Sequence, residues 1–482
     1  MKELWKHQIT GVQKALAQDN FAFFFDMGTG KTATTINVIR HRCQQNGRLM
    51  KVLIVAPLSV VNNWKKEFIQ FSKIDHRDIL VCDQSGKKRL EKFKLFVQNE
   101  HTLTLSKPRV IVTNYESFQM KDFVAALKEW GPEILVCDES HRLKSHESKR
   151  AKIIADFADG VKHKILLTGT PILNSAMDIF MQLRVLDGGQ SFGKNFWAFR
   201  SQYFEDENAA WASRPGHFPK FEPRPATFKQ FNDIIYKKAM RVMKHEVLDL
   251  PPLVKEEVEV TLGKEQQKLY NDMRDTFLAY IESEEKAGKP RAVVAQLAIT
   301  KSLRLQQIIS GFAKDEEGKI HVIQENPRIN VLQDYLEQLV SGHKVIVWSC
   351  FHENYRLISA LLERLKIGFA QYHGLISTND REEQLDRFRK DPDCRVMVAN
   401  QGAGGVGINL VEASYSIFYS RNFSLEQDLQ ATARNHRGGS EIHNKVTRID
   451  LIARGTIDDV ISEVLAGKLD AAETILNMRK RL

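Results

Sequence analysis

A glycine-rich segment followed by lysine and threonine, FFFDMGTGKTAT at residues 23–34, has the composition of a phosphate-binding loop. An apolar run typical of a buried strand precedes the glycines, and a run that can begin a helix follows them. Backbone N–H groups would turn inward around phosphate oxygens, and the N-terminus of the helix would add positive potential. Lys31 would reach the β- and γ-phosphates, and the Thr32 hydroxyl would hold Mg²⁺. The residues assigned to the nucleotide are Gly28, Thr29, Gly30, Lys31 and Thr32.

An acidic pair, Asp138 and Glu139, ends the apolar run EILVC and supplies the second component of such a site. Ligand sites in α/β sheets form at the C-terminal ends of strands. Asp138 can hold magnesium through water, and Glu139 can accept a proton from the attacking water. The strict loop pattern has glycine where this chain has Phe25, so a chance glycine turn is one alternative. For the acidic pair the alternative is a helix N-terminus, where acids are common. Loop and acidic pair together, in this order within one lobe, favour hydrolysis of a nucleoside triphosphate.

Two blocks of short apolar runs alternate with helical patterns and would position these residues. Each run is continuous and ends in polar or small residues, as expected for parallel strands buried on both faces. The alternation predicts an α/β fold with two doubly wound parallel-sheet lobes. The runs are 21–25, 51–57, 109–115, 133–140 and 164–171 in the first block, and 344–350, 368–374, 394–400, 415–420 and 448–453 in the second.

The middle of the chain differs in composition and hydrophobic pattern, which predicts mostly helical insertions between the lobes. Residues 172–245 are aromatic and basic without clear strands, and residues 249–262 have the alternation of an extended connector. Residues 264–312 have a helical pattern, and 315–319 form a turn. We expect an N-terminal ATP-binding lobe over 1–250 and a C-terminal lobe over 251–482, with insertions at about 172–245 and 251–325.

The bulk composition permits a polyanionic partner without proving one, since 70 Lys and Arg face 60 Asp and Glu for a net charge of +10. The five cysteines are scattered and never spaced as CxxC, which argues against a disulfide framework or a zinc site. This cysteine usage fits a reducing cytoplasm. No run approaches the roughly 18 apolar residues of a membrane span, and the start MKELWKHQ lacks the apolar core of a signal peptide.

Six segments, in sequence order, resemble the motifs of Snf2-like ATPases, which belong to superfamily 2 of helicases and translocases. The resemblance spans nearly the whole chain, including LWKHQITGV at 4–12. It implies two RecA-like lobes, ATP and Mg²⁺ as cofactors, and DNA as partner. The six segments are DMGTGKT, APLSVVNNWKKEF (56–68), DESHRLKS (138–145), LTGTPILN (167–174), GAGGVGINL (402–410) and QATARNHRGGS (430–440).

The resemblance also implies roles for single residues. Gln8 would read the adenine edge, which predicts ATP over GTP. Thr168 and Thr170 would couple the phosphate site to nucleic acid. At the interface between lobes the resemblance places Gly405, Gly407 and Asn409, with Gly407 also assigned to the nucleotide. Facing the nucleotide from the second lobe it places Gln430, Arg434 and Arg437.

The two arginines lie one helical turn apart. If QATARNHR is helical, Arg434 and Arg437 share roughly one face, and the helix ends at the glycines that follow. Arginine suits this place because its fork stays charged and can bridge phosphate oxygens as charge develops. The alternative is a pair of solvated helix arginines. The second lobe departs from the family where members commonly carry a Thr-Arg or Thr-Lys pair, an Ile and a closing Gln. The residues found there are Gln401, Gly402, Gly438 and Ser440.

Helicase-like lobes grip a strand mainly through its phosphates, with amides and hydroxyls at loop ends. Each of the candidates named at the end of this paragraph could instead be a structural residue that caps a loop or forms a turn. Trp64 is expected to pack in the core with Phe68 and Phe71, and the aromatic stretch 192–204 to form a buried helix face rather than to stack bases. The candidates for nucleic-acid contact are Ser59, Asn62, Thr113, Lys144, Ser349, His373 and Asn400.

The combined expectation is a monomeric DNA-dependent ATPase that translocates along duplex DNA and remodels forked or branched DNA. The resemblance favours tracking along the duplex without full strand separation. Two alternatives stay open. One is a strand-separating DNA or RNA helicase, and the other is a nucleotide-gated DNA-binding or partner-remodelling subunit with little translocation.

Overall fold

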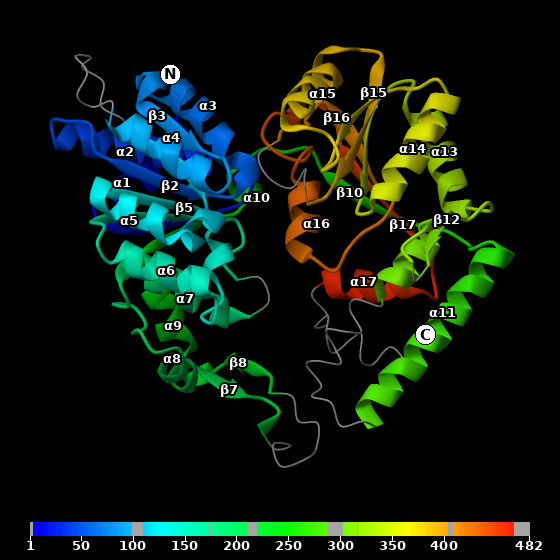
Figure 1. The fold of residues 1–482 in the computed structure, drawn as a ribbon, viewed down its shortest axis with the longest axis horizontal. Helices are drawn as coiled ribbons and strands as arrows, with labels where there is room; N and C mark the ends of the chain where they lie inside the picture. The colour runs from blue at the N-terminus through cyan, green and yellow to red at the C-terminus, as the bar shows by residue number, and fades with distance from the viewer. Residues whose placement is uncertain are drawn as a thin grey trace. The chain divides into compact units, whose positions relative to one another are not determined.

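The computed structural model describes residues 3–98, 109–172, 175–209, 219–286, 302–315, 317–402 and 408–466. The chain divides into two compact units, Met1–Leu248 and Asp249–Leu482 (Figure 1). Each unit is built on its own parallel sheet. We refer to the units as the first and second lobes. No helix in the described part of the chain is both long and apolar enough to cross a membrane.

The first lobe contains a seven-stranded sheet in the order β3-β4-β2-β5-β6-β1-β9, and every neighbouring pair is parallel. The predicted runs of the first block all form strands, and most of their residues are buried because helices cover both faces. The strands are β1 (Asn20–Phe25), β2 (Val52–Ala56), β3 (Ile79–Cys82), β4 (Val110–Asn114), β5 (Ile134–Asp138), β6 (His163–Leu167) and β9 (Ala239–Val242).

Alternate residues of β1 face opposite sides of this sheet, and each side has its own helices. Ala22 and Phe24 belong to a large core cluster that also takes side chains from the later helices. On the other side, a Cβ on Gly11 would lie 3.2 Å from the rings of both Phe23 and Phe25, so the first helix packs there. The helices are α1 (Lys6–Leu16), α2 (Lys31–Gln45), α3 (Val61–Phe71), α4 (Lys87–Gln98), α5 (Lys121–Trp130), α6 (Lys149–Ala158), α7 (Ile179–Asp187), α8 (Phe196–Tyr203), α9 (Pro225–Lys237) and α10 (Lys244–Val247).

The expectation that residues 172–245 lack strands is wrong. Strand β9 extends the main sheet beside β1, while β7 (Phe204–Asp206) and β8 (Phe221–Pro223) form an antiparallel ribbon. These strands are short and lie at a sheet edge or in a two-stranded ribbon, so they carry no continuous apolar run. The aromatic stretch does form a buried helix face, since Phe199 and Tyr203 of α8 are buried.

The second lobe contains a six-stranded parallel sheet in the order β10-β17-β16-β13-β15-β14. The five predicted runs of the second block all form strands. The strands are β10 (Leu253–Glu259), β13 (Lys344–Ser349), β14 (Gly368–Tyr372), β15 (Cys394–Asn400), β16 (Ala413–Phe418) and β17 (Val446–Ile452).

Helices cover this second sheet on both sides, as Figure 1 shows. One core cluster joins α13 (Pro327–Leu339) and α14 (His352–Arg364) to one face, and another joins α15 (Thr378–Lys390) and α16 (Leu425–Thr432) to the other. A third cluster packs α11 (Lys264–Lys286) and a helical stretch at 302–309 against α17 (Ile457–Leu465).

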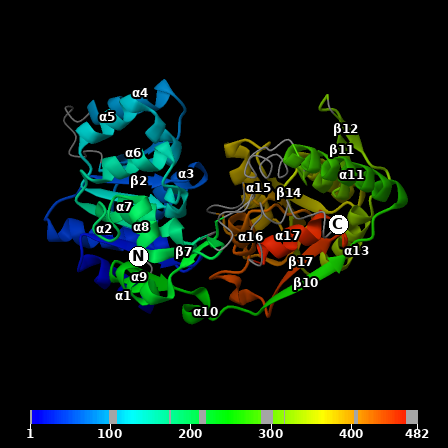
Figure 2. The same cartoon turned by 90° about the horizontal axis from the view of Figure 1, so that it is seen from below.

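The segment expected to be a connector is an edge strand. Residues 253–259 form β10, which pairs in parallel with β17 from Leu253↔Val446 to Glu259↔Ile452 (Figure 2). Because β10 lies at the edge of the sheet, only one side of the strand is hydrogen-bonded, and all of its side chains are at least partly exposed. The predicted turn at 315–319 joins a short hairpin of β11 (Phe312–Lys314) and β12 (Ile320–Val322).

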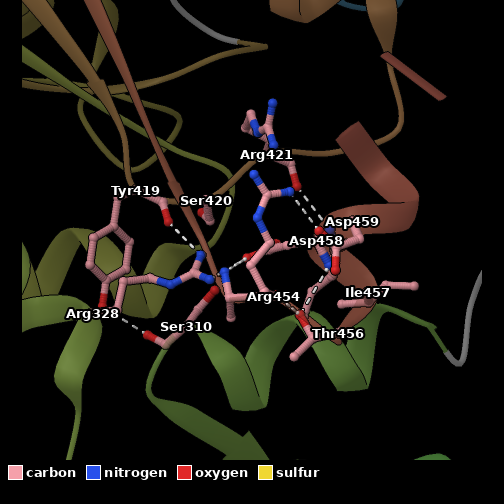
Figure 3. A network of polar contacts seen from close by, with 12 residues as sticks. Ser310, Arg328, Tyr419, Ser420, Arg421, Arg454, Thr456, Ile457, Asp458 and Asp459 are labelled. Atoms are coloured by element: carbon pink, nitrogen blue, oxygen red, sulfur yellow. Dashed lines mark hydrogen bonds and ion pairs between the residues drawn. The ribbon is translucent and has the colours of Figure 1, made fainter. Parts of the chain in front are cut away.

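A buried arginine fixes the first turn of α17 to the rest of the second lobe, as Figure 3 shows. Arg328, at the start of α13, is 1% exposed and donates to the carbonyl of Tyr419 at 2.8 Å and to the carboxylate of Asp458. The Tyr419 hydroxyl donates in turn to the carbonyl of Ser310 at 3.0 Å. Three separate segments therefore meet at one guanidinium.

Candidate nucleotide site

The strand register of the first lobe brings three loops together at the carboxyl ends of neighbouring strands. Leu167 of β6 pairs with Phe23 of β1 on one side and with Asp138 of β5 on the other. The phosphate loop follows β1, Asp138 and Glu139 lie at the end of β5, and the threonine segment, which holds Thr168 and Thr170, follows β6. Because the strands are parallel, the three segments emerge on the same side, at the carboxyl ends where α/β sheets bind ligands.

The phosphate loop has the backbone that its glycines predict. Gly28 and Gly30 have φ values of 85° and 84°, in the left-handed region that favours glycine. Gly30 is the N-cap of α2, so the first N–H groups of this helix open toward the loop. Lys31 begins the helix, and its ammonium donates to the carbonyl of Phe25 at 2.9 Å. The loop is therefore shaped for an anion, with its lysine held beside it.

Two side chains of α1 hydrogen-bond to the backbone of this loop. The Thr29 carbonyl accepts hydrogen bonds from His7 Nε2 at 2.8 Å and from Gln8 Nε2 at 3.2 Å. Gln8 also accepts the Trp5 backbone N–H at 2.9 Å. A Cβ at Gly30 would lie 2.0 Å from the amide nitrogen of Gln8. Gln8 thus holds the loop in shape, and its expected contact with adenine stays a prediction.

Asp138 ends β5 as a buried carboxylate with a donor on each oxygen. Trp64 of α3 donates its indole N–H to Oδ2 at 2.9 Å, and the backbone N–H of Glu139 donates to Oδ1 at 3.0 Å. Burial and the charge of Glu139 raise the pKa of Asp138, and the Trp64 hydrogen bond partly offsets this rise. Trp64 does pack in the core as predicted, but its helical spacing gave no sign that its nitrogen reaches the site.

Glu139 occupies a strained position at the start of a short 3₁₀ turn. Its φ is 52°, in the left-handed region that non-glycine residues rarely adopt. The carboxylate is buried, and among the described residues its Oε2 has no hydrogen-bond partner. His141 Nδ1 lies 3.4 Å from that oxygen. Strain at a buried acid with a spare acceptor atom is typical of a functional site.

A polar chain leads from the acidic pair to the threonine segment. His141 Nδ1 lies 3.0 Å from the Thr168 hydroxyl, which accepts the backbone N–H of Thr170 at 3.0 Å. Ser140 donates to Gln182 at 2.8 Å, and Gln182 donates to the Pro171 carbonyl at 2.7 Å. The loops after β5 and β6 are therefore connected twice through buried side chains. The histidine was not singled out from the sequence, where it reads as one more loop residue.

The donor set suits magnesium only when a phosphate is present. Asp138 and Thr32 offer hard oxygen atoms, and each Asp138 oxygen keeps acceptor capacity beyond its one hydrogen bond. Among the described residues no group of three or more His, Cys, Asp or Glu could hold a metal. Mg²⁺ usually binds through one or two carboxylates plus phosphates and water, and these residues fit that pattern.

In the second lobe, two of the resembling motifs contact each other. Arg434 Nη1 and Arg437 Nη1 both donate to the Ile408 carbonyl, at 3.2 and 3.4 Å, and the Arg434 carbonyl accepts the Leu410 N–H at 3.0 Å. Arg389 donates to the neighbouring Asn409 carbonyl at 2.7 Å. The glycines at 405 and 407, including the nucleotide contact assigned to Gly407, lie outside the described residues.

The expectation that both arginines share a helix face is wrong, because α16 ends at Thr432. The residues that follow bond through their side chains to distant parts of the second lobe. Asn435 donates to the Ala413 carbonyl at 3.1 Å, and His436 Nε2 lies 2.9 Å from the Pro251 carbonyl. Within α16, Gln430 is buried and donates to Glu426 at 3.0 Å. The roles given to Gln430, Arg434 and Arg437 stay predictions.

The candidates for nucleic-acid contact differ in exposure. In the first lobe, Asn62 is exposed and donates to Asp83 at 3.4 Å, and Lys144 is partly exposed near Asp178. Thr113 is fully buried, and its hydroxyl donates to the Cys82 carbonyl at 3.4 Å. The side chain of Ser59 lies outside what the structure describes.

The second-lobe candidates cluster around Tyr355, with Ser349 and His373 buried and Asn400 partly exposed. His373 stacks on the Tyr355 ring with centroids 4.2 Å apart, and Asn400 donates to its hydroxyl and to the Ser349 carbonyl. The Ser349 hydroxyl donates to Asn354 at 2.9 Å. Burial lowers the pKa of His373 to about 4, so the ring is neutral near pH 7. These side chains are engaged within the lobe, and their contact with a strand stays a prediction.

Two family descriptions match the chain. The SNF2-related domain matches residues 7–310, more than half of the chain, and the helicase conserved C-terminal domain matches residues 327–439.

Among curated proteins, the chromodomain-helicase-DNA-binding protein 1-like of Danio rerio is 28% identical over 460 residues, covering 94% of this chain and 41% of that protein. The SWI/SNF-related matrix-associated actin-dependent regulator of chromatin subfamily A-like protein 1 homolog of Caenorhabditis elegans is 26% identical, covering 98% of this chain and 61% of the relative. The chain thus spans less than two thirds of either relative. Among solved structures, a Sulfolobus solfataricus SWI2/SNF2 ATPase core in complex with dsDNA aligns at 22% identity with a TM-score of 0.43, covering 99% of this chain and 93% of that one.

Proposed function

The chain belongs to the SNF2-related family of helicase-like ATPases, and on that premise we propose that it is a motor core that couples ATP hydrolysis to movement along duplex DNA. The ATP hydrolysis part of this proposal rests on the arrangement of residues at the carboxyl ends of the first sheet's strands. There the glycine loop, the buried Asp138 and the strained Glu139 all follow strand ends in register.

In this proposal each side chain has a separate task. The loop N–H groups and Lys31 bind the phosphates of ATP, because they present positive charge at the start of a helix. Glu139 accepts a proton from the attacking water through Oε2, the carboxylate oxygen with no hydrogen-bond partner among the described residues. His141 limits how far that carboxylate can turn, since its ring nitrogen lies 3.4 Å away.

Asp138 and Thr32 would hold Mg²⁺ at the same edge. When bound with ATP, this ion neutralises charge on the β- and γ-phosphates. The indole of Trp64 keeps the Asp138 carboxylate in one orientation, and its hydrogen bond favours the ionised form that a metal requires. Trp64 is therefore a positioning residue for the metal ligand.

The nucleic-acid half of the proposal has broader support. The net charge of +10 suits a polyanion. The Danio rerio relative is named a helicase-DNA-binding protein, and we extend DNA binding to this chain. The linkage between Glu139, His141 and Thr168 offers a path by which DNA bound near the threonine segment alters the hydrolytic site. We further propose that forked or branched duplexes are the preferred substrates and that the chain acts as a monomer.

The test is the ATPase rate without nucleic acid and with single strand, duplex, fork and RNA. Duplex and fork should stimulate wild type, and Glu139→Gln should bind ATP and DNA yet lose turnover, because only proton acceptance is removed. Lys31→Ala should lose turnover under every condition. Equal wild-type rates with and without DNA would leave only a nucleotide-gated binding function, and RNA-specific stimulation with strand separation would identify an unwinding helicase.

A further inference from the structure

A buried arginine on β17 hydrogen-bonds to two residues of α16 that lie one turn apart. Arg448 is 3% exposed, and it donates to both carboxylate oxygens of Asp428 at 2.7 and 2.8 Å. The same guanidinium donates to the Thr432 hydroxyl at 2.7 Å, and it lies 3.9 Å from the centre of the Phe418 ring. Because Asp428 and Thr432 are one turn apart, Arg448 sets both the position and the rotation of this short helix.

The end of α16 that Arg448 holds leads directly to Arg434. Thr432 is the last helical residue, and its hydroxyl also donates to the Asp428 carbonyl at 2.9 Å. Two residues later, the Arg434 backbone and guanidinium bond to Leu410 and Ile408. A shift of the helix end would therefore move the arginine segment and the motif beside it.

The charges around Arg448 balance within the protein core. Its Nε donates to Asp450 at 2.8 Å, and the other Asp450 oxygen accepts from Arg421 at 3.2 Å. Arg421 donates in turn to Ser462 of α17 at 2.6 Å. Two guanidinium groups thus face two carboxylates, and all four residues are buried. Such a cluster has one well-paired geometry, because displacing one member leaves another buried charge without its partner.

We infer that Arg448 is a positioning residue for ATP hydrolysis, which acts by fixing the end of α16 and with it Arg434 and Arg437. The inference rests on the proposed function, since it assigns those two arginines to the nucleotide during turnover. The inference requires that lysine cannot replace Arg448. A lysine ammonium cannot bind both oxygens of Asp428, the Thr432 hydroxyl and Asp450 in fixed directions.

Three variants test the inference through DNA-stimulated kcat, KM for ATP and unfolding midpoint. Arg448→Lys should lower kcat by roughly tenfold to a hundredfold while KM changes little, because small misplacements of a catalytic group cost about that much. Thr432→Val keeps all four charges and should lower kcat in the same direction, with a moderate fall in the unfolding midpoint because one buried guanidinium N–H loses its acceptor. The double variant Asp428→Asn/Arg448→Met removes one charge of each sign, so it should unfold close to wild type yet keep a low kcat.

Arg454→Lys is the control, because Arg454 follows the same strand but pairs at the surface with Glu257 and Asp459. Its kcat should match wild type. Wild-type kcat in both Thr432→Val and the folded double variant would overturn the inference and leave Arg448 a structural residue. If the double variant does not fold, Thr432→Val decides alone. A wild-type chain without ATPase activity under any condition would instead overturn the proposed function, and this inference with it.

Discussion

Asp138 lies at the end of a buried strand with a tryptophan indole and a backbone amide as its hydrogen-bond donors. Its carboxylate must be ionised to hold a metal, yet burial and Glu139 raise its pKa. Removing the indole N–H takes away one of the contacts that lower this pKa. The balance of these effects should therefore be visible in the pH dependence of turnover.

We expect Trp64→Phe to shift the acid limb of kcat/KM for ATP to higher pH, because Asp138 then takes up its proton more readily. A lost hydrogen bond of about 1 kcal/mol corresponds to somewhat less than one pH unit. The control is Trp130→Phe in the same lobe, since Trp130 is also buried but its nitrogen has no hydrogen-bond partner among the described residues. An acid limb that moves equally in both variants would show that lost packing, not the hydrogen bond, is responsible.

A second residue-scale prediction concerns Gly30. A methyl group there would meet the Gln8 amide at 2.0 Å and force it off the loop, in addition to straining a backbone with φ of 84°. Gly47→Ala is a matched control, because φ is 65° and nothing lies within 4 Å of the added carbon. Gly47→Ala should lose about 1 kcal/mol of unfolding free energy from backbone strain alone, and Gly30→Ala should lose more because Gln8 is also displaced. Only Gly30→Ala should weaken ATP binding, by about tenfold or more. Equal ATP affinities, measured with a fluorescent analogue, would mean that Gln8 does not shape the loop.

At the scale of helices and strands, the sequence predicted the elements that have a pattern of their own. Continuous apolar runs such as residues 51–57 and 394–400 became central strands, because both of their faces are buried. The edge strand β9 and the short β3 were missed, since neither carries such a run over enough residues. The end of α16 was misplaced, since the segment after Thr432 bonds through Asn435 and His436 to distant carbonyls, and no local pattern contains such contacts.

The same contrast holds within the candidate site. Residues that act through local backbone shape, such as Gly30 and Lys31, could be predicted, because strand, loop and helix are adjacent in the chain. Trp64 and His141 could not, since their roles depend on contacts with Asp138 and Thr168 that arise only when the sheet is assembled. Burial of a tryptophan at helical spacing looks the same whether or not its nitrogen meets a carboxylate.

The segment after α16 gives the third prediction. Arg437→Ala should leave ATP affinity within about tenfold, because this residue is not part of the phosphate loop. DNA-stimulated hydrolysis should fall by about 10³-fold or more, as expected for an arginine that stabilises charge developing on the transferred phosphate. Steady-state ATPase with saturating duplex is measured beside Arg454→Ala, a surface arginine of the same lobe. Near-normal turnover in Arg437→Ala would remove it from the mechanism.

The attachment of α17 gives the fourth. Asp458→Asn leaves Arg328 buried without an ionised partner, which should cost about 3–5 kcal/mol of unfolding free energy. The adjacent change Asp459→Asn affects a more exposed carboxylate, which pairs with Arg454 and accepts the Gly455 N–H, and it should cost about 1 kcal/mol. Urea unfolding of the two variants makes the comparison. Similar losses in both would show that the contact in Figure 3 is not a special anchor.

For the whole molecule, we propose that the first lobe hydrolyses ATP and that the second lobe contributes arginines to the reaction. Each lobe is a parallel α/β sheet with its own core. The SNF2-related match covers the first lobe and continues into the second, and the helicase C-terminal match lies within the second. A chain of this kind is a motor only if the energy of hydrolysis becomes movement on DNA. ATPase stimulation by DNA alone does not distinguish movement from binding.

The most direct test of that claim is displacement of a third strand from duplex DNA of increasing length. We predict that wild type with ATP removes the third strand after a delay that grows in proportion to the duplex separating it from the loading end, while Glu139→Gln removes none. Continued ATP hydrolysis with the third strand left in place at every length would contradict the claim, because the chain would then hydrolyse ATP on DNA without moving along it.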